Sequence, residues 1–143
     1  MILADVNVLV FAFRRGATDH ARYRAWLEAA LAGPGPFGVS ELVLSGVVRV
    51  ATNAALLQDG TSPDDVLAFA ESLRNHPHAR VCRPGPRHWP IFADLCRTVG
   101  TRGAVVADTY HAALAIEHGC EWVTTDRDFA RFPGLRWRHP LDA

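Results

Sequence analysis

Acidic residues stand within or directly beside apolar segments at four widely separated places in this chain of 143 residues. They are Asp5 within the run Met1–Val10, Glu41 after residues 37–40, Asp108 at the head of the helical-looking segment 108–116, and Asp126 after residues 122–125. An ionised carboxylate in apolar surroundings is costly unless another group compensates it, and a divalent cation compensates several at once. If one fold gathers these acids, the pattern predicts a magnesium site suited to phosphodiester chemistry.

Apolar segments of two kinds alternate along the chain. Short and nearly continuous runs indicate buried parallel strands, and longer segments with a spacing of three, four, seven and eight residues indicate helices. The predicted strands span 1–6, 37–39, 79–82, 122–124 and 135–137, and the predicted helices span 20–32, 40–51 with Ser40 as N-cap, 63–74, 88–99 and 107–118. This alternation predicts an α/β domain with a mainly parallel sheet.

Length and composition indicate one domain over residues 1–143. No apolar run is long enough for a membrane span, and Asp5 lies where a signal peptide would be apolar, so we expect a cytoplasmic protein without a membrane partner. The three cysteines, Cys82, Cys96 and Cys120, contain no Cys-x-x-Cys pair. We therefore expect buried free thiols in a reducing compartment.

All fifteen basic residues are arginine, and the net charge is zero. Coding bias explains the missing lysine, yet the chemical consequence holds whatever its origin. Phosphatases similar to haloacid dehalogenases, receiver domains and Walker-type nucleotide sites all need a lysine, so these classes are excluded.

The predicted positions of the acids favour one common site. Asp5 and Asp126 end strands, Glu41 lies two residues past a strand, and ligands of open α/β sheets bind beyond the carboxyl ends of strands. Structural alternatives exist for three of the acids: Asp108 could cap its helix, Glu41 could interact with a helix dipole, and Asp126 could belong to a turn. A helix cap does not explain Asp5. The acids read as structural are Asp19, Asp59 in a turn with Gly60, Asp64, Asp65 and Asp94.

Four segments carry the acids together with characteristic neighbours. They are Asp5-Val6-Asn7-Val8-Leu9; Ser40-Glu41-Leu42-Val43-Leu44-Ser45 with Arg49-Val50-Ala51-Thr52-Asn53; Asp108-Thr109-Tyr110-His111-Ala112-Ala113-Leu114-Ala115; and Val123-Thr124-Thr125-Asp126-Arg127-Asp128-Phe129 with Arg131-Phe132-Pro133-Gly134-Leu135. In this order they resemble PIN-domain ribonucleases, and the last resembles the C-terminal signature of the VapC toxins of bacterial toxin–antitoxin pairs. The resemblance covers essentially the whole chain.

The resemblance implies a PIN-like α/β/α sandwich and a metal-dependent endoribonuclease, a hydrolase that acts as the toxin of such a pair. It implies that Asp5, Glu41, Asp108 and Asp126 are catalytic and use Mg²⁺ or Mn²⁺. Asp5, Asp108 and Asp126 are the expected metal ligands, and Glu41 is expected to bind a second metal or to orient water. The implied partners are an RNA substrate, a cognate antitoxin and a second copy of the chain.

Other residues are assigned supporting positions by the same resemblance. Asn7 and Thr124 are expected to hold the metal ligands by hydrogen bonds, and Asp128 is expected to be an outer acid. Gly46 departs from the pattern, because many relatives carry an acid there.

Two assignments stay open at this point. His111 could act as a general base or could pack in the core. Four arginines, Arg127, Arg131, Arg136 and Arg138, could hold RNA phosphates or form a solvated face. A housekeeping PIN nuclease and a non-catalytic PIN-like scaffold that binds RNA or protein are the alternative functions.

Overall fold

The structure is a computed structural model, and it describes residues 1–53 and 60–142. Within these residues, all paired strands run parallel in one sheet of order β3-β2-β1-β4-β5. The strands are β1 (Ile2–Ala4), β2 (Phe37–Val39), β3 (Ala79–Val81), β4 (Glu121–Val123) and β5 (Trp137–Arg138). The central strand β1 pairs with β2 on one side and with β4 on the other. The predicted α/β class with a parallel sheet is confirmed.

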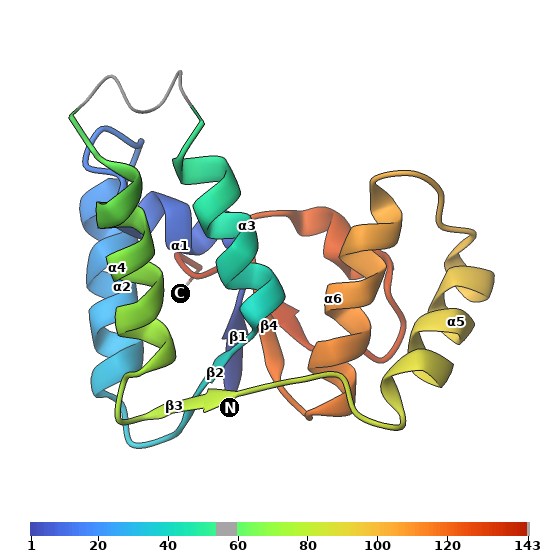
Figure 1. The fold of residues 1–143 in the computed structure, drawn as a ribbon. Helices are drawn as coiled ribbons and strands as arrows, with labels where there is room; N and C mark the ends of the chain where they lie inside the picture. Colours follow the sequence, from blue (N-terminus) through green and yellow to red (C-terminus); the bar gives the residue numbers. More distant parts are fainter. Residues whose placement is uncertain (54–59, 143) are drawn as a thin grey trace.

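Helices cover both faces of this sheet, as Figure 1 shows. They are α1 (Val6–Phe13), α2 (His20–Ala32), α3 (Glu41–Ala51), α4 (Pro63–Arg74), α5 (His88–Val99), α6 (Val105–Glu117) and the 3₁₀ helix η2 (Arg127–Arg131). Helix α1 packs against α2 and α3, α3 packs against α4, and α5 packs against α6. The groups α1–α4 and α5–α6 lie on opposite sides of the sheet (Figure 1).

Several helix starts follow directly from the sequence. Ser62 and Asp65 form a reciprocal capping box, with Pro63 in the first helical position of α4. Ser40 caps α3 by accepting a hydrogen bond of 3.3 Å from the backbone N–H of Val43. These signals explain why the predicted bounds of α3 and α4 are confirmed.

Helix α1 corrects the first predicted strand. We expected a strand over residues 1–6, but β1 ends at Ala4 and a helix begins at Val6. Asp5 is the N-cap of that helix, and its Oδ1 accepts a hydrogen bond of 2.7 Å from the backbone N–H of Val6. The expectation that a helix cap does not explain Asp5 was therefore wrong.

Smaller differences concern the second half of the chain. Helix α6 begins at Val105, so Asp108 lies within its first turn and does not cap it. The strand predicted at 135–137 lies at Trp137–Arg138, and the 3₁₀ helix η2 was not predicted. The predicted turn at Asp59 lies outside the described residues.

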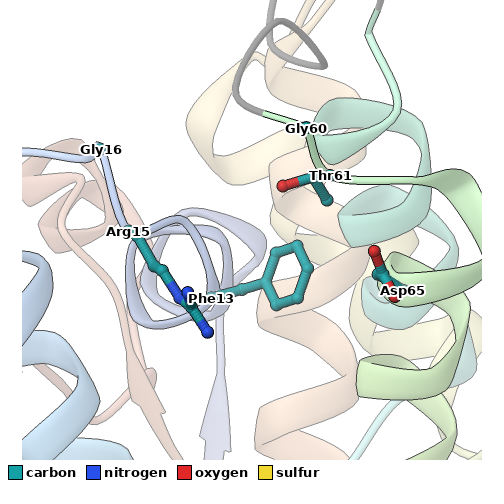
Figure 2. Close-up of a pocket in the computed structure, with 6 residues that line it drawn as sticks. All are labelled: Phe13, Arg15, Gly16, Gly60, Thr61 and Asp65. Atoms are coloured by element: carbon teal, nitrogen blue, oxygen red, sulfur yellow. The ribbon is translucent and has the colours of Figure 1, made fainter.

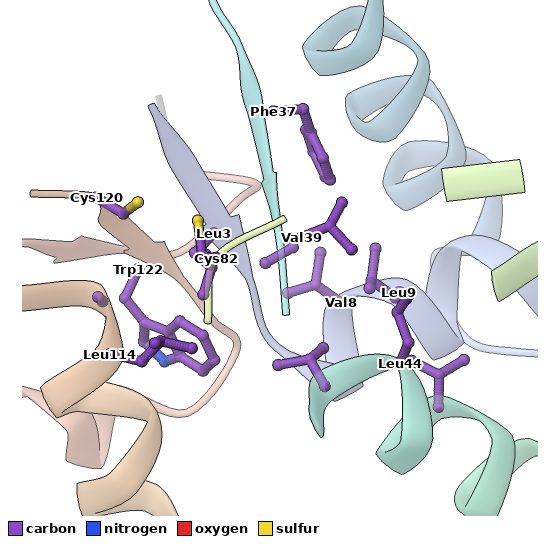
Figure 3. Close-up of a cluster of buried hydrophobic side chains, with 14 of the residues drawn as sticks. Leu3, Val8, Leu9, Phe37, Val39, Leu44, Cys82, Leu114, Cys120 and Trp122 are labelled. Atoms are coloured by element: carbon purple, nitrogen blue, oxygen red, sulfur yellow. The ribbon is translucent and has the colours of Figure 1, made fainter. Parts of the chain in front are cut away.

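The core lies between the sheet and its helices. Figure 3 shows Leu3, Phe37 and Trp122 from neighbouring strands among the buried side chains, with Leu114 of α6 beside Trp122. These four residues are at most 2 % exposed. No helix in the described part of the chain is long and apolar enough to cross a membrane.

Candidate active site

The sheet order places two of the candidate acids next to each other. The chain leaves β1 toward β2 and β3 and later returns to β4 on the other side of β1, so β1 and β4 form the point at which the strand order reverses. Ligands of parallel α/β sheets bind beyond the carboxyl ends of strands at such a point. Asp5 directly follows β1, and Asp126 lies three residues past the end of β4.

Thr124 joins these two strand ends. Its hydroxyl donates a hydrogen bond of 2.6 Å to Oδ2 of Asp5, and its oxygen accepts one of 3.0 Å from the backbone N–H of Asp126. Thr124 is fully buried and Asp5 is 8 % exposed. Since Val6 donates to the other oxygen of Asp5, each carboxylate oxygen is held by one donor. The orientation of Asp5 is thus fixed from both sides, while lone pairs on both oxygens stay available to a ligand.

Asp126 organises the segment that follows. Its Oδ1 accepts a hydrogen bond of 2.9 Å from the backbone N–H of Asp128, which caps η2. The structural alternative considered for Asp126, a place in a turn, is therefore correct, because its carboxylate caps η2. Asp128 is exposed, and Arg131 contacts it twice, with Nε at 2.9 Å from its carbonyl oxygen and Nη2 at 3.2 Å from its carboxylate.

Asp108 reaches the same region from the other side of the sheet. Burial is the main cause that raises its pKa, and the negative charges of Asp5 and Asp126 raise it further, while Arg131 opposes them. Burial also raises the pKa of Asp5, with a contribution from the charge of Asp126. The three aspartates thus act on one another electrostatically although more than a hundred residues separate the first from the last.

The chemistry of these three acids suits a divalent cation. Their oxygens are the hard ligands that Mg²⁺ prefers, and their mutual repulsion is the condition that a bound cation relieves. In residues 1–53 and 60–142, however, no three acidic, histidine or cysteine side chains approach closely enough to enclose an ion in the present arrangement. The chemistry of the three carboxylates fits the ion, but their present positions do not enclose it, so binding would require the side chains to move.

Glu41 does not share this environment. It is the first residue of α3, and its carboxylate accepts from Nε of Arg74 at 3.0 Å and lies 3.3 Å from Nε of Arg83. The hydrogen bond from Arg74, together with the charge of Arg83, lowers the pKa of Glu41. Glu41 is not among the groups that raise the pKa of Asp5 or Asp108. The structure brings three of the four predicted acids together and holds the fourth on two arginines.

Asn7 and Gly46 lie near Asp5 in different ways. Asn7 is exposed in the first turn of α1, and within the described residues its side chain makes no hydrogen bond to the acids, so its supporting role stays a prediction. A Cβ atom on Gly46 would lie 2.7 Å from Cγ2 of Val6, the residue after Asp5. The departure from the family pattern at Gly46 therefore allows α3 to approach α1 closely.

His111 belongs to the core beneath Asp108. Its ring stacks on that of Trp122 at a centroid distance of 5.4 Å, and burial lowers its pKa to about 4. Its Nδ1 is buried without a hydrogen-bond partner among the residues that the structure describes. The stacking and the burial of the ring fit the packing alternative considered for His111.

The four C-terminal arginines already have partners. Arg127 forms two hydrogen bonds with Asp142, Arg131 pairs with Asp128, Arg138 pairs with Glu121, and Arg136 donates to a backbone carbonyl. These contacts lie at the protein surface, where Arg127 is 63 % exposed, and they are compatible with both alternatives considered for these arginines. The sequence contained no signal for Arg131 as the cation that acts on Asp108.

A separate hollow lies away from the acids. It has a volume of about 490 Å³ and lies between the end of α1 and the start of α4, where Figure 2 shows Phe13, Arg15 and Asp65 among its lining residues. None of the candidate acids lines it. We therefore assign it no part in the site.

Comparison with known proteins identifies the family of this chain. The model of the PIN domain family matches residues 2–135. Ribonuclease VapC43 of Mycobacterium tuberculosis is 44% identical over 142 residues, which cover 99% of this chain and 97% of the relative. Ribonuclease VapC25 of the same organism is 37% identical over 140 residues, covering 98% and 99%. A chain in the solved VapBC2 structure from Rickettsia felis, bound to a promoter DNA fragment, has a TM-score of 0.71 at 16% identity, with coverage of 97% of this chain and 98% of that one. The present chain therefore belongs to the PIN-domain family and, within it, to the VapC ribonucleases.

Proposed function

We propose that this protein is a metal-dependent endoribonuclease that hydrolyses RNA phosphodiester bonds and acts as the toxin of a toxin–antitoxin pair. The observation that carries the proposal is the fixed, buried carboxylate of Asp5, held by Thr124 and Val6 and facing the charges of Asp108 and Asp126. This arrangement places three carboxyl groups close together at the edge of the sheet where we propose that the substrate binds. The names of the relatives identify them as ribonucleases, which supports the reaction class.

Each residue has a distinct part in this proposal. Asp5, Asp108 and Asp126 would hold Mg²⁺ or Mn²⁺, and when bound the ion supplies Lewis-acid stabilisation of the phosphate and an activated water. Thr124 orients Asp5 and favours its ionised form, because its hydroxyl donates to the carboxylate and lowers a pKa that burial raises. Asp128 holds Arg131 close to the acids. We propose that the side chain of Asn7 forms its supporting hydrogen bond only when the metal ion or the RNA is bound.

Glu41 requires an additional step. We propose that it orients water or a second ion, and for this it must leave Arg74 and Arg83. Glu41→Gln and the pair of variants Arg74→Met and Arg83→Met separate this role from a structural one. A water-orienting role lowers kcat only in Glu41→Gln, whereas a purely structural ion pair gives all three variants the same loss of stability and activity.

The central test compares Asp5→Asn and Asp108→Asn with Asp94→Asn. Asp94 is exposed on α5 and serves as the matched control. We expect cleavage of RNA by the wild type and the control, with loss in excess EDTA and recovery with Mg²⁺ or Mn²⁺. The two site variants should stay folded and lose activity. Near-normal cleavage by both variants, or full cleavage in EDTA by protein free of contaminating nucleases, contradicts the proposed site.

An antitoxin partner is supported by the solved neighbour, a VapBC complex. A groove of about 280 Å³ between α3 and α4 adjoins Glu41 and is lined by Leu44, Val48 and Leu67, the last 47 % exposed. We propose that an antitoxin segment occupies this groove and directs an arginine toward the aspartates, because bidentate guanidinium contacts would neutralise them.

Co-expression distinguishes the toxin from the alternative functions. Expression of the chain alone should arrest growth, and the product of an adjacent small gene should restore growth and block cleavage in vitro. A chain that cleaves RNA without toxicity is a housekeeping PIN nuclease, and a folded chain that binds RNA without cleaving it is a scaffold. Light scattering coupled to size exclusion tests the expected homodimer.

A further inference from the structure

Two of the three cysteines meet in the core, although 37 residues lie between them. Cys82 follows β3 and Cys120 precedes β4, and both thiols are free and buried. Figure 3 shows their sulfur atoms facing each other beside Leu3. Each thiol donates to a backbone carbonyl, Cys82 to Arg80 at 3.6 Å and Cys120 to His118 at 3.8 Å, and each thiol alters the pKa of the other. The proposed nuclease function uses neither thiol.

The path of the chain explains this meeting. After β3 the chain crosses the sheet toward α6, and the N–H groups of Gly85 and Arg87 donate to the carboxylate of Glu117 at 2.8 and 3.0 Å. Gly38 of β2 lies beneath the crossing, where an added Cβ would lie 2.9 Å from Cδ1 of Leu3 and 3.5 Å from Sγ of Cys82. A side chain at Gly38 would clash with β1, at 2.7 Å from the carbonyl oxygen of Ile2, but would only touch Cys82 in ordinary van der Waals contact.

The surroundings of Cys82 favour its thiolate. The hydrogen bond from Cys120 is the main cause that lowers the pKa of Cys82 to about 7, and the charge of His118, the backbone N–H of Val39 and the charge of the N-terminal amino group add to it. When Cys82 is neutral, its thiol lies 3.6 Å from the carbonyl oxygen of Arg80. The same contact raises the pKa of Cys120, which therefore stays protonated beside the Cys82 thiolate. Redox-active dithiols also place a low-pKa cysteine next to a second thiol, although those cysteines are typically more exposed than Cys82 and Cys120.

We propose that Cys82 and Cys120 form a dithiol modification site that hydrogen peroxide converts into an intramolecular disulfide. The Cys82 thiolate attacks one peroxide oxygen, the O–O bond breaks, and Cys82 becomes a sulfenic acid while hydroxide leaves. The Cys120 sulfur then attacks the sulfenic sulfur, its proton is taken up, and water leaves as the S–S bond forms. The two thiols supply the two electrons that reduce one peroxide to two waters. The resulting bond joins the end of β3 to the start of β4.

Peptide mapping of the wild-type protein without reduction tests this proposal, with Cys96 on α5 as the internal control thiol. Folded protein is treated with hydrogen peroxide, its remaining thiols are alkylated, and its digest is analysed by mass spectrometry. We expect Cys82 and Cys120 to lose their thiols together, in a linked peptide pair two hydrogens lighter, while the chain stays free of intermolecular disulfides and Cys96 is still alkylated. If Cys96 oxidises while both other thiols persist, or if Cys82 proceeds to a sulfinic acid with Cys120 unchanged, the proposal is overturned.

A variant isolates the first step. In Cys120→Ser, whose hydroxyl keeps a hydrogen-bond donor beside Cys82, Cys82 should stop at the sulfenic acid, which dimedone captures. Absence of the dimedone adduct in folded Cys120→Ser, as judged by circular dichroism, contradicts the assigned order of attack. Because the mapping uses the wild-type chain, the proposal stays testable even if this variant does not fold, and neither measurement depends on ribonuclease activity.

Discussion

Replacement of Thr124 by valine removes one hydroxyl and preserves the shape of the side chain. The hydroxyl donates to Asp5 at 2.6 Å in fully buried surroundings, and hydrogen bonds to charged groups contribute about 1.5–3 kcal/mol. It also accepts from the N–H of Asp126 at 3.0 Å, for which about 1 kcal/mol is typical. We therefore expect Thr124→Val to lower the free energy of unfolding by about 2–4 kcal/mol near neutral pH.

The pH dependence identifies the cause of this loss. The hydroxyl favours the ionised form of Asp5 and so lowers a pKa that burial raises. Without the hydroxyl, the pKa of Asp5 rises further. Of the two folded proteins, the wild type then has the lower Asp5 pKa, so its extra stability is fully present above both pKa values. The difference between wild type and Thr124→Val should therefore shrink as pH falls from the Asp5 pKa of the variant through that of the wild type.

Urea unfolding at several pH values measures this difference, with Thr124→Ser and Thr125→Val as controls. Thr124→Ser keeps the hydroxyl and should lose about 1 kcal/mol for its missing methyl group. Loss of a residue that orients a metal ligand typically costs about 10–100-fold in metal affinity or activity, and we expect this for Thr124→Val. If Thr124→Val equals Thr125→Val in stability at neutral pH and in Mn²⁺ affinity, the orienting role of Thr124 is wrong.

Three further predictions follow from particular contacts. In the folded protein the pKa of His111 is about 4, against an ordinary value of 6.5, so the unfolded chain takes up this proton first as pH falls. The free energy of unfolding should therefore drop by about 3 kcal/mol between pH 6.5 and pH 4. Urea unfolding of His111→Phe should show a pH dependence without this contribution. Gly46→Ala should lower the Tm measured by calorimetry, although alanine favours helices. The added Cβ would lie 2.7 Å from Cγ2 of Val6, and such overpacking costs about 1–3 kcal/mol. An unchanged or higher Tm would show that α1 can move away from α3 at little cost. Mn²⁺ should raise the Tm of the wild type and of Asp94→Asn, but not that of the double variant Asp5→Asn/Asp108→Asn. Equal increases in Tm for all three proteins would show that the ion binds elsewhere.

The sequence predicted those helices whose apolar residues recur at helical spacing. The predicted bounds of α2, α4 and α5 match the structure, and of these three only α4 also has a side-chain cap at its start. Helix α1 escaped prediction because seven of its eight residues are apolar, so no helical periodicity is visible. Its helical form depends on packing against α2 and α3, which single-segment propensity does not contain.

The site was predictable to the extent that it follows from strand ends. Asp5 and Asp126 come together because β1 and β4 are neighbours, and the rule on strand ends needs only the order of elements. The hydrogen bond from Thr124 was expected only from the family resemblance, and the structure supplies its geometry. The capping of α1 by Asp5 was not predictable, since α1 itself was not recognised.

Glu41 shows why residue type alone does not define a metal ligand. Its partners Arg74 and Arg83 come from the end of α4 and from the segment after β3, and no local pattern near Glu41 announces them. The hydrogen bond from Arg74 and the charge of Arg83 lower the pKa of Glu41, whereas burial and repulsion raise those of Asp5 and Asp108. A cation entering the site relieves repulsion among the aspartates but must compete with two guanidinium groups for Glu41. The free energy of metal binding should therefore come mainly from the three aspartates, and Glu41→Gln should change turnover more than it changes metal affinity.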